Sequence, residues 1–126
     1  MNEQALNYLG LARKGGNLET GDEPVRAAVR AGHAKLVLLA ADAGEAVARK
    51  IRNLAAGSRQ RVLTIPYDKL TLGAALGRQV VSVAAFADVS MALAFVKTLP
   101  AGTAPADLTE DLERRVARVK AKRKKA

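Results

Sequence analysis

The residues most able to do chemistry in this sequence are the carboxylates around Gly21, in the segment NLETGDEPVRAAV. Glu19 precedes the glycine, and Asp22 and Glu23 follow it. A carboxylate at the start of a helix accepts backbone amides, which predicts Asp22 as the N-cap and Glu23 as a favourable charge in the first turn. The same carboxylates can instead accept two parallel hydrogen bonds from a ligand. The residues alone leave both interpretations open.

The rest of the side-chain inventory argues against an enzyme. The chain has no cysteine and a single histidine, so thiolate catalysis, disulfides and a soft-ligand zinc site are excluded. We find no Ser/His/Asp set, metal-ligand cluster or nucleotide-binding glycine motif, and we expect His33 to lie at the surface. We therefore expect no catalysis, no metal and no cofactor.

The positive charge divides the chain into two parts. Residues 1–100 hold 13 Lys/Arg against 8 Asp/Glu, whereas residues 101–126 hold 8 against 4, with every cation after Glu113. The segment LPAGTAPADL between them has the composition of a linker. We expect a folded domain over residues 1–100, followed by the linker and a basic tail that becomes helical only under suitable conditions. No signal peptide or long apolar run is present, so we expect a cytoplasmic protein with no membrane partner.

The hydrophobic patterns predict the elements that must position these residues. Helical periodicity and buried apolar runs alternate along residues 1–100. We expect Leu11 on the buried side of the first helix, and Asp42, Asp68 and Asp88 at the starts of later helices. The alternation predicts an α/β fold, a three-layer α/β/α sandwich around a mixed four-stranded sheet. The expected helices are 2–16, 22–33, 42–57, 67–77 and 88–99, and the expected strands are 17–21, 34–41, 61–66 and 80–86.

Two segments, AGHAKLVLLAADA and LGAALG, together with the order of elements, resemble the L7Ae/L30e ribosomal-protein superfamily. The resemblance is to its small bacterial YlxQ-type members in particular, and it runs from about Leu6 to Leu99. It implies an L30e-like fold and non-catalytic binding of structured RNA, typically at a kink-turn or related internal loop. Ribosomal RNA or another non-coding RNA, and ribosomal or translation-related proteins, are the partners implied.

The resemblance also implies where the RNA would bind. The superfamily reads RNA at the turn between the first strand and the second helix with a Gly-x-Asn-Glu pattern followed by a lysine. In this sequence Gly21 matches the glycine, Asp22 takes the variable position, and Glu23, Pro24 and Ala27 replace the asparagine, glutamate and lysine. The carboxylates thus stand where the reading side chains would be, and a carboxylate can accept the N1–H and N2–H2 edge of guanine.

Further expected RNA contacts lie near this turn if the family fold holds. Arg13 and Lys14 end the first helix, Arg26 lies one turn into the second, and the segment Arg78, Gln79 and Val80 begins the loop expected against an extruded nucleotide. We expect these segments to converge at one end of the sandwich, with Lys35 and Lys69 as weaker candidates. The basic tail would add affinity without much specificity.

A protein–protein interaction module of the same fold is the alternative function. The side chains replaced at Glu23, Pro24 and Ala27 are those an RNA contact uses, and superfamily members with altered RNA motifs include some that bind proteins. The chain has only two Phe, two Tyr and no Trp, so it lacks the stacking platform of single-strand RNA readers. If RNA is the partner, we expect folded RNA recognised by shape and backbone.

Overall fold

Two fully buried strands form the centre of the sheet and explain the apolar runs of the sequence. Strands β2 (Leu36–Leu39) and β4 (Val83–Phe86) pair antiparallel, and every residue in both is buried. Strand β1 (Leu18–Thr20) pairs antiparallel with β4, and β3 (Val62–Thr64) pairs parallel with β2, so the order is β1-β4-β2-β3. A strand covered on both faces needs apolar side chains on both, which is why neither central strand alternates. The mixed four-stranded sheet is as predicted.

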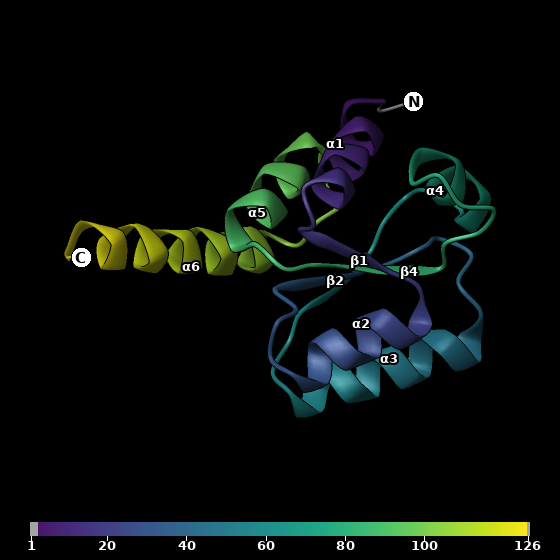
Figure 1. The fold of residues 1–126 in the computed structure, drawn as a ribbon, viewed down its shortest axis with the longest axis horizontal. Coiled ribbons are helices and arrows are strands. Elements are labelled where there is room, and N and C mark those ends of the chain that lie inside the picture. Colours follow the sequence, from purple (N-terminus) through teal and green to yellow (C-terminus); the bar gives the residue numbers. More distant parts are fainter. Residues whose placement is uncertain (1–2, 126) are drawn as a thin grey trace.

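Helices cover both faces of this sheet in the computed structural model, which describes residues 3–125 (Figure 1). Helices α1 (Glu3–Lys14), α4 (Lys69–Ala75) and α5 (Val89–Thr98) lie on one face, and α2 (Asp22–Arg30) and α3 (Glu45–Gly57) lie on the other. The predicted three-layer sandwich is therefore confirmed.

Each face of the sheet has its own apolar core. The core under α1, α4 and α5 contains Leu9 and the tilted ring pair of Phe86 and Phe95, whose centroids are 5.4 Å apart. The core under α2 and α3 contains Val25 and Ile51 among its buried side chains. Leu11, in contrast to our expectation, is 63% exposed. The buried stripe of α1 follows Ala5, Leu9 and Ala12, so position 11 turns outward.

Aspartates set several helix boundaries, but not all those predicted. Asp68 accepts the Thr71 N–H at 2.7 Å and Asp88 accepts the Ser90 N–H at 2.7 Å, so both caps are confirmed. The predicted cap at Asp42 is wrong, because α3 begins only at Glu45 and its N-cap is Gly44. Asp42 instead accepts the Lys69 N–H at 2.8 Å, which ties the segment after β2 to the start of α4.

The basic tail forms helix α6 (Ala106–Lys125), which extends away from the sheet (Figure 1). Leu108 and Leu112 on its first turns are buried in the same core as α5. Although the helix has too few apolar residues to be stable alone, these two leucines attach it to the domain. The boundary at residue 100 stays a prediction. Within residues 3–125, no helix is long and apolar enough to cross a membrane.

Candidate functional site

The turn between β1 and α2 is built on Gly21. Its backbone has φ 97° and ψ 160°, a conformation that side chains with a Cβ rarely adopt. The Gly21 N–H donates to the Val83 carbonyl at 2.9 Å, and the Gly21 carbonyl accepts the Val25 N–H at 3.1 Å. Gly21 is thus the N-cap of α2, with no side-chain cap, and the prediction of Asp22 as N-cap is wrong. The helix begins one residue earlier because the glycine itself makes the turn.

Asp22 pairs with the next turn of its own helix. Its Oδ2 lies 3.2 Å from a terminal nitrogen of Arg26, an i, i+4 ion pair. Its Oδ1 is buried and, within the described part of the chain, accepts no hydrogen bond. The carboxylate therefore cannot accept a two-donor ligand without leaving Arg26. Glu23 is exposed beside it, in the first turn where its charge favours the helix.

Arg78 lies across this turn, although it is 58 residues from Thr20 in sequence. Its Nη1 donates to the Thr20 hydroxyl at 3.0 Å and approaches the Thr20 carbonyl at 3.4 Å. A Cβ placed on Gly21 would lie 3.7 Å from the same nitrogen, so the guanidinium covers the glycine at contact distance. Both hydrogen bonds use Nη1, and the rest of the planar guanidinium can donate to a ligand.

Helix α4 fixes the position of the Arg78 loop. The Arg78 N–H donates to the Gly73 carbonyl at 2.8 Å, and the Val81 N–H donates to the Lys69 carbonyl at 3.0 Å. A Cβ on Gly73 would lie only 2.5 Å from the Gln79 carbonyl oxygen, so this close approach requires glycine. Gln79 and Val80 are exposed, with Val80 46% accessible, and they present a polar and an apolar side chain beside Arg78.

Arg13 brings a second cation to the loop. Its Nη1 lies 3.7 Å from the position of a Cβ on Gly77, which places the end of α1 beside the Arg78 segment. Lys14 is exposed at the last residue of α1. The expected convergence of the first helix end, the Gly21 turn and the Arg78 loop is therefore present in the geometry. Whether these residues bind a ligand stays a prediction.

Several residues of this site were not identified from sequence. Thr20, which holds Arg78, and Gly73, which positions the loop, carry no local signal of their roles, because both depend on contacts between distant segments. The Asp22–Arg26 pair did have a signal, namely its i, i+4 spacing. Lys35 lies elsewhere, at the opposite end of β4, where its N–H donates to the Phe86 carbonyl at 2.7 Å.

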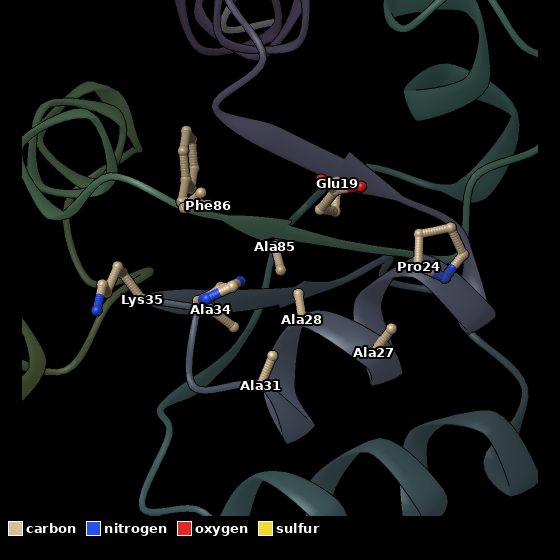
Figure 2. A pocket seen from close by; sticks show the side chains of 11 residues that line it. Glu19, Pro24, Ala27, Ala28, Ala31, Ala34, Lys35, Ala85 and Phe86 are labelled. Carbon is tan, nitrogen blue, oxygen red and sulfur yellow. The ribbon is translucent and has the colours of Figure 1, made fainter.

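An alanine-lined hollow of about 550 Å³ runs beside the turn (Figure 2). Pro24, next to Gly21, lies at one end of it and Lys35 at the other. Small side chains line it, including Ala27 of α2, its C-cap Ala31 and Ala85 of β4. Its polar lining side chains are Glu19, His33 and Lys35, which do not form a nucleophile–base pair.

Two groups next to the start of α4 have shifted pKa values. Accepting the Thr71 backbone N–H lowers the pKa of Asp68 below its ordinary value. Burial raises the pKa of the Tyr67 phenol. Asp68 is the N-cap of α4, and Tyr67 directly precedes it.

Comparisons with known proteins agree with this geometry. The model of the ribosomal protein L7Ae/L30e/S12e/Gadd45 family matches residues 3–94. A solved structure of a protein of unknown function from Bacillus halodurans is similar at TM-score 0.69 and 28% identity, covering 75% of this chain and 95% of the other. The Giardia lamblia 15.5kD RNA binding protein is similar at TM-score 0.62 and 18% identity, covering 77% and 83%. A search of curated protein sequences found no significant match.

The family match covers all five helices and four strands of the sandwich except the last residues of α5. It includes the Gly21 turn, the Arg78 loop and the end of α1, and it excludes α6. The resemblance read from the sequence is confirmed: the chain belongs to the ribosomal protein L7Ae/L30e/S12e/Gadd45 family.

Proposed function

We propose that this chain binds structured RNA, without catalysis, at a kink-turn or related internal loop. The proposed surface consists of Arg13, Lys14, Gly21, Asp22, Glu23, Arg26, Arg78, Gln79 and Val80. Membership of the L7Ae family supports RNA as the ligand, as does the fold shared with a Giardia protein described as RNA-binding. Ribosomal or another non-coding RNA is the proposed source, with ribosomal or translation-related proteins as further partners.

One observation carries the proposal: the Arg78 guanidinium is held over the Gly21 turn by Thr20, at 3.0 Å. The turn exposes the amides of Asp22 and Glu23 at a helix N-terminus, because the first intrahelical hydrogen bond comes from Val25. Arg78 therefore adds a cation beside a helix end that already favours anions. A phosphate or a guanine edge placed here meets backbone donors and a guanidinium together.

The acidic residues of the turn are compatible with an RNA ligand. Arg26 offsets the charge of Asp22 through their 3.2 Å contact. Glu23, in place of the superfamily asparagine, is then the exposed carboxylate that can accept a guanine N1–H and N2–H2. In this proposal Glu23 reads a base, and Arg13 and Arg78 position the backbone. The cations of α6 add affinity that does not depend on sequence.

The test compares an RNA containing an internal loop of sheared G–A pairs with a fully paired duplex of equal length. We expect the full chain to prefer the loop RNA. Arg78→Glu should reduce that preference roughly tenfold to a hundredfold, since a charge-assisted contact is lost and a repulsive one introduced. Lys50→Glu makes the same charge change on the exposed surface of α3 and should leave the preference unchanged. Equal binding of loop and duplex by the unmodified chain would refute the proposal.

A protein partner is the alternative function, and the alanine-lined hollow favours it. The hollow adjoins the Gly21 turn through Pro24 and is mainly apolar, as a protein contact requires. Under this alternative the chain shows no loop preference. Ala31→Arg, which fills the hollow, would then abolish binding to the protein partner.

A further inference from the structure

Helix α6 forms a groove with the residue before β2 and the first residue of α5, which the sequence did not predict. The groove has a volume of about 380 Å³, and Lys35 and Val89 of the domain line one side of it. Residues of α6 line the other side. Counted from Asp111 they lie at positions i, i+4, i+7, i+8 and i+11, so one face of the helix supplies them. These residues are Asp111, Arg115, Arg118, Val119 and Lys122.

The domain holds α6 in a fixed orientation next to this groove. Leu108 and Leu112 are 1% and 0% exposed, packed in the core with α5. Arg61, just before β3, lies 2.9 Å from Asp107 and 4.0 Å from Asp111. The helix is therefore attached by both apolar burial and ion pairs. Its cations extend from a defined position, unlike those of a flexible arm.

The groove carries an excess of positive charge. Its one carboxylate, Asp111, is only 17% exposed and lies 3.3 Å from Arg115 and 3.6 Å from Arg114. Asp111 is thus already balanced by arginines. Among the residues that the structure describes, none of the ion pairs involves Lys35, Arg118 or Lys122. Three cations from two separate segments therefore face this groove without a carboxylate partner.

The groove lies at the opposite end of the sheet from the Gly21 turn. Gly21 bonds to Val83 at the start of β4, and Lys35 bonds to Phe86 at its end, about 10 Å of strand away. The alanine-lined hollow connects the two ends, from Pro24 to Lys35 (Figure 2). Lys35 lines both the hollow and the groove. The surface between the two sites is therefore continuous, with Glu19 as the acidic side chain that lines it.

We infer that the groove formed by Lys35, Arg118 and Lys122 binds the phosphate backbone of an RNA stem that flanks the loop at the Gly21 turn. This inference rests on the proposed function and extends it. An internal loop has a stem on each side, and a stem leaving the turn along the hollow reaches the groove. Ammonium and guanidinium groups on one helix face suit successive phosphates, whose contacts position an RNA without reading its sequence.

The experiment measures the affinity of the full chain for internal-loop RNAs in which each stem is shortened in turn. We expect shortening of one stem to weaken binding to the unmodified chain roughly tenfold at low salt. Combining Lys35→Ala, Arg118→Ala and Lys122→Ala should abolish this dependence on stem length. It should also lower the slope of log affinity against log salt by about three, one for each lost phosphate contact.

Two further variants test the geometry. Arg49→Ala, Lys50→Ala and Arg52→Ala together remove equal charge from α3 and should leave the dependence on stem length intact. Leu112→Ala changes no charge but removes a buried attachment of α6, so it should weaken the dependence, with circular dichroism confirming that the domain remains folded. The inference is overturned if the groove variant keeps the full dependence on stem length, or if Leu112→Ala does so after α6 is shown to be released. If the unmodified chain shows no preference for loop RNA over duplex, the proposed function itself is overturned.

Discussion

The substitution Gly73→Ala tests whether helix α4 positions the Arg78 loop. The added Cβ would lie 2.5 Å from the Gln79 carbonyl oxygen and 2.8 Å from the Arg78 carbonyl oxygen. Both are backbone atoms, which cannot rotate away as a side chain can. Since ordinary contact begins at 3.4 Å, the loop must retreat by about 0.9 Å, the difference from 2.5 Å. Arg78 would then move relative to Thr20 and Gly21.

The expected cost follows from overpacking. Adding a methyl to a closely packed site costs about 1–3 kcal/mol of unfolding free energy. For a chain of 126 residues, each kcal/mol lowers the melting temperature by about 4 °C. The cost is reduced if the loop moves, but then the Arg78–Thr20 hydrogen bond of 3.0 Å lengthens and loop-RNA affinity falls. Stability, affinity or both must therefore decrease.

The assays are urea unfolding and binding to the internal-loop RNA. Gly57→Ala is the matched control, because a Cβ at Gly57 meets no atom within 4 Å and the residue ends α3. We expect this control to be neutral or slightly stabilising, since alanine restricts the unfolded chain more than glycine does. A Gly73→Ala protein with unchanged stability and unchanged RNA affinity would refute the proposed role of Gly73.

Three further outcomes are expected. Gly21→Ala should destabilise the fold by about 1–3 kcal/mol, because the backbone φ of 97° is strained for alanine. The added Cβ itself has room, since its nearest neighbouring atom lies 3.7 Å away. Urea unfolding that matches the parent would contradict this. Asp68 has a lowered pKa in the folded state, so its stabilising contribution is present above its unfolded pKa and is lost as pH falls through the folded value. The unfolding free energy of Asp68→Asn, measured by urea unfolding at several pH values, should thus fall less steeply with acid than that of the parent. Identical pH dependence in the two proteins would disprove this. Arg61→Ala should speed amide hydrogen exchange in the first turns of α6 by removing its contact with Asp107, while exchange in α2 stays as it was.

Local patterns were sufficient to predict most of the architecture. A four-residue strand that is buried on both faces needs an unbroken apolar run, and LVLL of β2 is such a run. Asp68 and Asp88 were identifiable as caps because each stands directly before a helix whose second or third amide it accepts. The same reasoning failed at Asp22 and Asp42. There, Gly21 and Gly44 set the helix starts, and backbone conformation decided the cap over side-chain type.

The candidate site was predictable only in part. The Gly21 turn and the Arg78 segment were identified from sequence, but their contact was not, since Thr20 and Arg78 are 58 residues apart. Gly73 was not identified because its role depends on the path of another backbone segment. Likewise, helical spacing in the tail showed that Leu108 and Leu112 share a face, but not that α5 and the core would bury them.

Amino-acid order was sufficient to infer the alternation of helices and strands, the family, the absence of thiol chemistry and the two concentrations of positive charge. These properties follow from composition and short-range periodicity, which each segment carries alone. Only the packed fold shows that Arg78 covers the Gly21 turn and that Lys35 joins α6 in a separate cationic groove. Hydrogen bonds and close ion pairs act over a few ångströms, and only packing brings segments that are distant in sequence within that range.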